Sequence, residues 1–534
     1  MRKDNEMKKL EGKQKHIEYA LLAGVFLILC FFLYRYTVYT LDSDASSELV
    51  LARQLADEGT ILTKNWLYGS ELRVFYSQLI FAPLFALFDN WGTVRMAGTA
   101  LMLLGLLFGF SFFCREADCR HCFPLGAVLM LLPLSRIYFD VLFKFTYYLP
   151  HVIMGFLIPA TVLRCAGKST ALAGRRGYAP LVVGMLLSFA VGLNGMRMLL
   201  TVFFPLLLSA LLLLWLNGAT PTSKRLFAGF AVVTVFALAG CAVNALFLSK
   251  VYTVLDVTGI DFKNFSLSGI EKVLGGLITA FGYRSGKTVF SAALPYGAQA
   301  GLLLVLSIYS SVCVLRHRES YSVGQQFVAC YYLTSLLALF LVYTLTSMVF
   351  TSRYMVQTAV LGLLPIVTCF RQKEVFGKAG RSIIFGVTCF ALLCGALHYN
   401  DMRKEDKTRA QRECAQFLVD NGFTQGYASF WNGNVMTELS NGVLDIWVWD
   451  EKCAELQDPD EIVPFLQSKA HTSPPSDGRV FVLLSANEDY YCAFAQKFSD
   501  DNIVFKTANY ELGAIHEHII YGFDSYNELR RQFC

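Results

Sequence analysis

Charged side chains are scarce in this sequence. Asp, Glu, Lys and Arg make up 16% of its 534 residues, whereas a soluble domain usually carries about 25%. Hydrophobic residues reach 55%, and Phe alone occurs 44 times. This composition argues against a soluble globular protein and favours a chain that contacts lipid.

Motifs that mark common enzymes and transporters are also missing. The chain has no Walker-type loop, Rossmann glycine fingerprint, His-Glu-x-x-His zinc site or nucleophile elbow. Its net charge of +5 is modest, and no basic stripe alternates with aromatic residues, so we expect no nucleic-acid partner. The apolar segments lack the buried acid–base pairs of a proton-coupled transporter, which disfavours transport.

Long apolar runs are what the sequence has in place of charge. Several approach or reach the roughly 20 residues that a membrane-spanning helix needs. We predict about 11 spans, and the first is expected to be retained because no small-residue cleavage site follows it. The predicted spans are 19–34, 93–113, 123–139, 148–164, 179–193, 198–216, 227–248, 296–315, 327–348, 355–370 and 382–399.

Basic residues in the short loops indicate the orientation. The segment before the first span is rich in Lys and Arg, and clusters such as Lys224-Arg225 recur on the same side after every second span. We therefore predict a multi-pass protein of a bacterial plasma membrane, with its N-terminus inside and its C-terminus outside. The apolar stretch 79–88 is too short to span and is expected to lie along the outer leaflet.

Composition divides the chain into three parts. Residues 1–16 are a basic cytoplasmic N-terminus, residues 17–400 a mainly α transmembrane bundle, and residues 401–534 a small extracytoplasmic α/β domain. The bundle carries a first external loop, 40–92, with juxtamembrane helices. In the last part, strands are predicted at 426–430, 443–449, 480–484 and 515–522, and helices at 404–421 and 489–498.

Three carboxylates follow the first span directly: Asp42, Asp44 and Glu48. Asp44 could simply cap a helix that begins near Ala45, because Asp is a preferred N-cap residue. It could instead act as a general base, since a carboxylate partly removed from water at a membrane surface is well placed to accept a proton. Both interpretations stay open, with Asp42 and Glu48 as supporting acidic residues.

Basic residues gather at the same predicted face of the membrane. Arg197 lies in a tight turn between two spans, Arg353 precedes Tyr354 at the start of another, and Lys144 and His151 flank a third entry point. Arg suits bidentate contact with a phosphate at the outer leaflet. Each of these residues could instead be an ordinary interfacial side chain that extends to the headgroups.

The order and sidedness of these short motifs resemble the GT-C superfamily of polyprenyl-phosphate-sugar-dependent glycosyltransferases, such as protein O-mannosyltransferases and aminoarabinose transferases. Those enzymes have an acidic motif after the first span, followed by an amphipathic helix. This chain departs from them at Ala45, where Glu is frequent, and at Ser77-Gln78, where a Pro-rich run is frequent. The matching segments are Asp42-Ser43-Asp44, Arg53–Gly59, Glu71–Tyr76, Val94-Arg95, Asn194–Arg197 and Ser352-Arg353-Tyr354.

The resemblance implies a membrane glycosyltransferase that moves a sugar, with inversion, from a polyprenyl-phosphate donor to a glycan, lipid or protein acceptor at the outer face. It names no certain cofactor and leaves open a divalent cation, which Asp42 could help to hold; metal ligands are unknown. A cluster around Cys119 and Cys122 matches no closed zinc-site spacing. The implied roles are general base for Asp44; lipid-phosphate binding for Arg197, Arg353 and Tyr354; and substrate contact for Arg73, Lys144 and His151.

Two other functions are compatible with the sequence. The chain could be a non-catalytic transporter or flippase of lipid-linked envelope precursors. Alternatively, the C-terminal domain could be the functional part, binding glycan or protein through Trp431, Trp447 or Trp449. Tryptophans in small α/β domains are more often core residues, which weighs against the second alternative.

Overall fold

The computed structural model describes residues 2–146, 148–167, 178–255, 261–263, 265–284, 293–449, 463, 465–486, 495–507 and 517–533. The chain forms two compact units. The first unit contains residues 1–33, 100–246 and 258–403, and the second contains residues 34–99, 247–257 and 404–534. The second unit therefore combines the segment that follows the first long helix with the C-terminal part of the chain.

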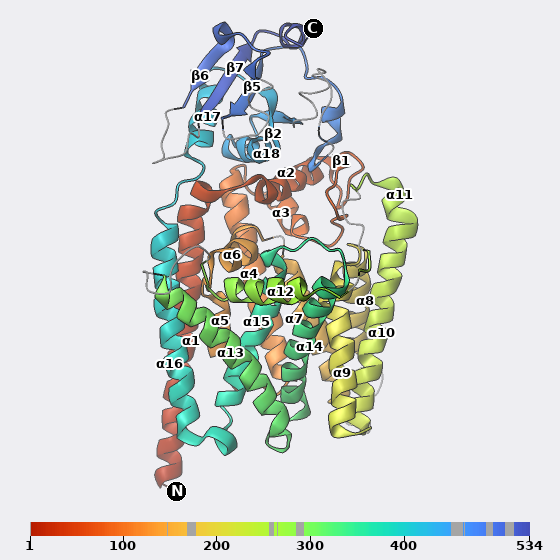
Figure 1. Cartoon of the computed structure of the whole chain (residues 1–534), viewed down its shortest axis with the longest axis vertical. Helices are drawn as coiled ribbons and strands as arrows, with labels where there is room; N and C mark the ends of the chain where they lie inside the picture. The colour runs from red at the N-terminus through yellow and green to blue at the C-terminus, as the bar shows by residue number, and fades with distance from the viewer. Residues whose placement is uncertain are drawn as a thin grey trace. The chain divides into compact units, whose positions relative to one another are not determined.

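Apolar helices dominate the first unit (Figure 1). Nine helices in the described part of the chain are long and apolar enough to cross a membrane, which confirms the predicted mainly α, multi-pass membrane fold. They are built from α1 (Arg2–Tyr36) with η1 (Thr37–Thr40), α4 (Trp91–Glu116), α7 (Leu149–Ala166), α9 (Phe204–Asn217) with η6 (Leu199–Phe203), α10 (Pro221–Val243) with η7 (Asn244–Leu248) and α11 (Ser249–Val251), α13 (Leu294–Arg316), α14 (Val323–Leu345), α15 (Val356–Phe370) with η9 (Ser352–Met355), and α16 (Lys373–Met402).

Two of the predicted spans differ from a straight helix of full length. The segment predicted at 123–139 is a pair, α5 (Phe123–Leu131) with η2 (Arg120–Cys122) and α6 (Arg136–Phe139) with η3 (Asp140–Lys144), bent by 108°. The break falls at Pro133, and the preceding residue, Leu132, is extended at ψ 144° because proline disfavours helical backbone before it. The helix α8 (Ala179–Gly192) has only 14 residues. The count of 11 spans stays a prediction.

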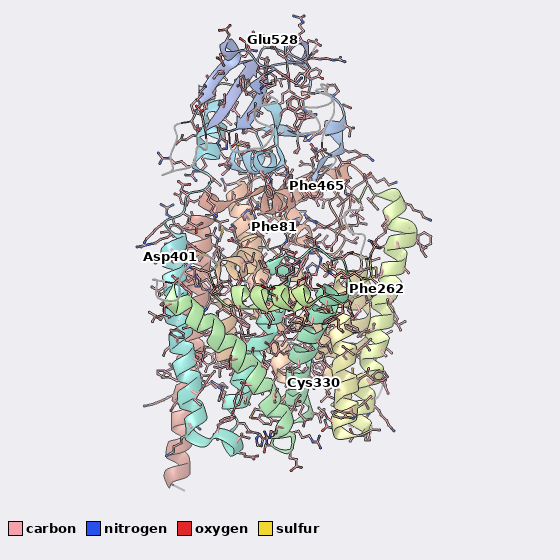
Figure 2. All side chains as sticks on the ribbon, viewed as in Figure 1. Phe81, Phe262, Cys330, Asp401, Phe465 and Glu528 are labelled. Carbon is pink, nitrogen blue, oxygen red and sulfur yellow. The ribbon has the colours of Figure 1, made fainter. Side chains whose placement is uncertain are left out.

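One helix of the first unit was not anticipated from the sequence. The helix α12 (Leu267–Ala280) runs across the bundle rather than along it (Figure 1). Its buried face carries glycines: a Cβ on Gly269 would lie 2.4 Å from the Tyr343 carbonyl oxygen, and one on Gly276 would lie 2.8 Å from the Met355 side chain. These close approaches pack α12 against the end of α14 and against η9. Just before α12, Phe262 is 89% exposed (Figure 2).

The C-terminal part of the second unit is an α/β domain, as predicted. Its five-stranded sheet has the order β3-β2-β5-β7-β6, with β2 parallel to β3 and β5, and β7 antiparallel to β5 and β6. The strands are β2 (Gln425–Ser429), β3 (Asp445–Trp449), β5 (Val480–Ser485), β6 (Ile503–Lys506) and β7 (His518–Phe523), and the helices are α17 (Arg409–Asp420), α18 (Phe430–Leu439) and α21 (Tyr526–Arg531). Most of the helix predicted at 489–498 lies outside the described residues.

Both faces of this sheet are buried. Alternate residues of β5 point to opposite sides, so that Phe481 joins the core under α17 and α18 while Val482 joins the core on the other face. Trp447 and Trp449 belong to that second core and are 6% and 2% exposed, whereas Trp431 is 60% exposed. Two of the three tryptophans considered as binding residues are therefore core residues.

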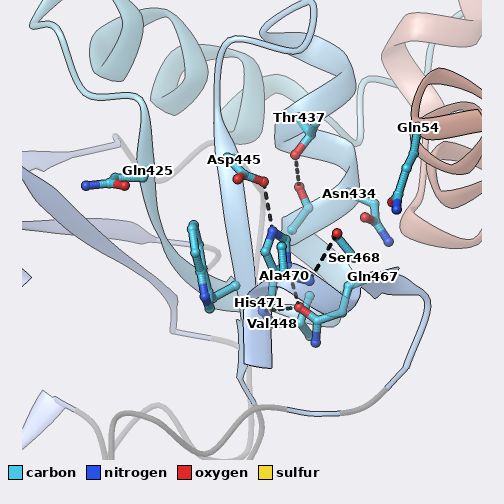
Figure 3. A network of polar contacts seen from close by, with 12 residues as sticks. Gln54, Gln425, Asn434, Thr437, Asp445, Val448, Gln467, Ser468, Ala470 and His471 are labelled. Atoms are coloured by element: carbon cyan, nitrogen blue, oxygen red, sulfur yellow. Dashed lines mark hydrogen bonds and ion pairs between the residues drawn. The ribbon is translucent and has the colours of Figure 1, made fainter. Parts of the chain in front are cut away.

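The loop between α1 and α4 is tied to the C-terminal domain by a short sheet within the second unit. The loop contains α2 (Ser43–Glu58), β1 (Trp66–Leu67) and α3 (Gln78–Leu84), and β1 pairs antiparallel with β4 (Gln467–Ser468). Figure 3 shows the polar network beside this pairing. The Gln467 Oε1 accepts hydrogen bonds from Val448 N at 3.1 Å and faces His471 Nδ1 at 2.8 Å, and His471 Nε2 faces Asp445 Oδ1 at 2.9 Å.

We expect Gly240→Ala to destabilise the first unit by about 1–3 kcal/mol, as overpacking of a close helix crossing usually does. The added Cβ would lie 2.3 Å from the Phe189 carbonyl oxygen of α8. The matched control is Gly301→Ala in α13, because a Cβ there meets nothing within 4 Å. Thermal unfolding of the purified protein in detergent should show a loss for Gly240→Ala alone; equal effects of both variants would contradict the close crossing.

Candidate functional site

The acidic turn at the start of α2 separates the roles of Asp42 and Asp44. Asp42 is the N-cap residue: its backbone is extended, and its carboxylate accepts a hydrogen bond from Ala45 N at 3.0 Å. The capping role considered for Asp44 thus falls to Asp42. Asp44 lies within the first helical turn and is half-buried. Its carboxylate is not the capping group, which keeps a general-base role available to it.

Glu48, one turn further along α2, is fully buried and paired. It forms an ion pair with Arg73 and accepts a hydrogen bond from Ser77 Oγ at 2.6 Å. Burial raises the pKa of the Glu48 carboxyl, and the nearby charge of Arg73 opposes this effect. Burial would lower the pKa of Arg73, but the charge of Glu48 holds it above its ordinary value. Arg73, predicted to contact substrate, is thus engaged with Glu48.

A second buried ion pair lies beside the same turn. Arg95 binds Glu438 through two contacts of 2.5 Å, Nε to Oε1 and Nη2 to Oε2, and both side chains are 4% exposed. The same Arg95 Nη2 donates to the Ala45 carbonyl oxygen at 3.1 Å. The sequence motifs pointed to Arg95 but not to Glu438. The two residues are 343 positions apart, and no local pattern in the sequence indicates that they form a pair.

A basic pocket forms in the first unit. Arg197 lies in the turn after α8, which Gly195 makes tight by adopting a φ of +104°. Its guanidinium lies 5.3 Å from the ring centroid of Tyr148 and equally far from that of Tyr354. The pocket between α7, η6 and η9 is lined by Val141, Tyr148, His151, Val152, Arg197, Thr201, Arg353, Tyr354, Val356 and Gln357.

The structure brings four of the predicted residues together here: Arg197, Arg353, Tyr354 and His151. Lys144 is not among the lining residues. It is 3% exposed and forms an ion pair with Asp140 at 3.0 Å. Tyr148 was missed by sequence analysis, although an aromatic pair at the start of a span is a common sign of the membrane interface.

The charge of this pocket suits an anion. Two Arg side chains line it, and no carboxylate does so among the residues that the structure describes. The tyrosine rings hold Arg197 by cation–π contact, so less side-chain freedom is lost when it binds a ligand. Within the described ranges, no group of three or more His, Cys, Asp or Glu residues could hold a metal ion.

Removing one member of the Glu48–Arg73 pair should destabilise the folded protein. We expect Glu48→Ala to lower the free energy of unfolding by about 3–5 kcal/mol, because it leaves the Arg73 charge buried without its partner. The double variant Glu48→Met/Arg73→Met should recover most of that loss. The matched control is Asp57→Ala, which breaks the exposed Arg53–Asp57 pair on the same helix and should cost about 1 kcal/mol or less. Denaturant unfolding measures the stability of all three variants. If Glu48→Ala lost as little free energy of unfolding as Asp57→Ala, the result would contradict a buried ion pair.

Comparisons with known proteins place the fold. ArnT from Cupriavidus metallidurans bound to undecaprenyl phosphate superposes with a TM-score of 0.56 at 13% sequence identity, over 94% of this chain and 97% of that chain. Its apo state gives a TM-score of 0.58 at the same identity and coverage. The Archaeoglobus fulgidus oligosaccharyltransferase in the apo form reaches 0.43 at 11% identity, over 79% of this chain and 64% of that chain.

No protein-family model and no curated protein matches the sequence. The structural agreement nevertheless extends over nearly the whole length of both this chain and ArnT. It confirms, at the level of the fold, the resemblance that the short motifs implied. The chain thus has the GT-C fold seen in ArnT, with nine helices in its described part that are long and apolar enough to cross a membrane.

Proposed function

We propose that this protein is a glycosyltransferase that moves a sugar from a polyprenyl-phosphate donor to an acceptor at the outer face of the membrane. The observation that carries the proposal is the anion pocket of Arg197 and Arg353 within a GT-C fold. ArnT, which has this fold, binds undecaprenyl phosphate. The acceptor is a glycan, lipid or protein.

The proposed reaction is a direct displacement with inversion. The acceptor hydroxyl attacks C1 of the sugar, its proton passes to Asp44, and the C1–O bond to the phosphate breaks. The electron pair of that bond leaves with the lipid phosphate, whose negative charge Arg197 and Arg353 neutralise. Cleavage of the bond between the sugar and the phosphate supplies the free energy for the transfer, so the scheme requires no nucleotide.

The arrangement around each group supports these roles. Asp42 caps α2, whereas Asp44 lies half-buried in the first helical turn, and we assign the proton transfer to Asp44. Arg197 is held between two tyrosine rings, and a planar guanidinium can donate two parallel hydrogen bonds to a phosphate. His151 lines the same pocket and adds a ring nitrogen that can donate to the phosphate.

We expect Asp44→Asn to lower kcat by at least about 10²-fold in proteoliposomes supplied with a polyprenyl-phosphate sugar and an acceptor, because the general base is lost. The matched control is Asp57→Asn, the same substitution at an exposed position of the same helix, which should leave kcat unchanged. Full activity of Asp44→Asn, with normal unfolding behaviour, would remove Asp44 as the base. Lipid that crosses the membrane with an unchanged headgroup would favour a flippase instead.

Arg197→Gln and Arg353→Gln should each weaken use of the donor by about 10–100-fold in kcat/KM, as expected for the loss of a charge-assisted hydrogen bond of roughly 1.5–3 kcal/mol. The KM for the acceptor should stay the same. Arg164→Gln is the matched control, because Arg164 also lies over an aromatic ring, that of Phe112, but lines a different cavity. Unchanged donor kinetics in both pocket variants would place the lipid phosphate elsewhere.

A further inference from the structure

The C-terminal domain holds the acidic turn from both sides. Before the turn, Thr408 Oγ1 donates to the Val38 carbonyl oxygen at 2.6 Å, and Lys407 N donates to the Tyr39 carbonyl oxygen at 2.7 Å. After it, the Arg95 guanidinium, bound to Glu438 of α18, donates to the Ala45 carbonyl oxygen at 3.1 Å. The residues between these anchors include both Asp42 and Asp44.

Glu438 fixes the orientation of the Arg95 guanidinium. The carboxylate occupies both Nε and one Nη nitrogen in a bidentate contact, which fixes the plane of the guanidinium and aims the same Nη2 at the Ala45 carbonyl. Arg95 stays charged at any pH at which proteins fold. The charge of Arg95 already acts on Glu48, and the Ala45 carbonyl that it binds belongs to the residue directly after Asp44. Without Glu438, we expect the guanidinium to turn toward these carboxylates.

The pair is not needed to attach the C-terminal domain. The β1–β4 pairing joins the loop to that domain independently of Glu438. The Trp91 N also donates to Asn441 Oδ1 at 2.7 Å, and Trp66, Tyr68 and Leu72 share a core with Leu466. A change at Glu438 can therefore alter the acidic turn while the two parts remain joined.

We infer that Glu438 is a positioning residue for transfer: through Arg95 it fixes the backbone at Ala45 and keeps the Arg95 charge away from the carboxylate of Asp44. The C-terminal domain then acts as a part of the catalytic apparatus and not only as a binding module. This inference rests on the proposed function, in which Asp44 is the general base.

The first test is Glu438→Gln in the full-length protein in proteoliposomes. The amide keeps the shape but loses the charge that holds Arg95, so we expect kcat to fall about 10²-fold, as small misplacements of a reacting group can do, with the KM for the donor unchanged. Glu413→Gln, at an exposed Glu–Arg pair of α17, is the control.

A second pair of variants separates positioning from stability. The exchange Arg95→Glu/Glu438→Arg restores opposite charges, but Glu at position 95 cannot donate to the Ala45 carbonyl. Arg95→Met/Glu438→Met removes both charges, which often leaves stability intact. We expect at least one of these proteins to unfold like the wild type while kcat stays about 10²-fold low. A stable double variant with wild-type kcat would overturn the inference, as would a wild-type kcat in Glu438→Gln.

Asp44→Asn, measured in parallel, separates a failure of the role inferred for Glu438 from a failure of the role proposed for Asp44. If Asp44→Asn is inactive and Glu438→Gln is fully active, only the inference about Glu438 fails. If Asp44→Asn is fully active, Asp44 is not the base, and the proposed function fails in that respect whatever Glu438→Gln does. An inactive Asp44→Asn together with a slow, normally folded Glu438→Gln supports both.

Discussion

Lipid offers no hydrogen-bond partner to the peptide backbone, and this constraint decides most of the structure. Each spanning segment must satisfy its own N–H and C=O groups as a helix, which is why helices of 18–35 residues dominate. The exceptions lie where other protein groups surround the chain: the bend at Pro133 is followed by Ser135, whose Oγ accepts from Tyr138 N and donates to the Ala280 carbonyl. Deeply buried charges are paired, as in Glu48 with Arg73 and Arg95 with Glu438.

Local patterns in the sequence were enough to find most of the elements. Hydrophobic runs of the right length indicated the spanning helices, and short, mostly apolar runs indicated the strands β2, β3, β5 and β7. The helix α12 was missed because its 14 residues are too few to span a membrane and lie between two predicted spans, in a segment expected to be a loop. The strand β6 was missed because it has only four residues, half of them exposed.

The candidate site could be predicted only in part, and the reason is distance along the chain. The order of acidic and basic motifs pointed to Asp44, Arg197 and Arg353, because each motif is local. The partners that define their surroundings are not local: Glu438 is 343 residues from Arg95. Burial of the Glu48–Arg73 pair likewise depends on packing that no window of sequence displays. Short motifs thus indicate which residues could react. The tertiary structure decides which of these residues are engaged in ion pairs.

The second unit is discontinuous, and this has a consequence for biosynthesis. Its three segments, 34–99, 247–257 and 404–534, are made in that order, with most of the helical bundle synthesised between them. When the ribosome has produced the first segment, Arg95 still lacks Glu438 and β1 still lacks its partner strand β4. The acidic turn can reach its final form only after the segment that carries Glu438 and β4 has been made. A polypeptide that is interrupted before this segment would lack these contacts of the acidic turn, so the turn is completed at the last stage of synthesis.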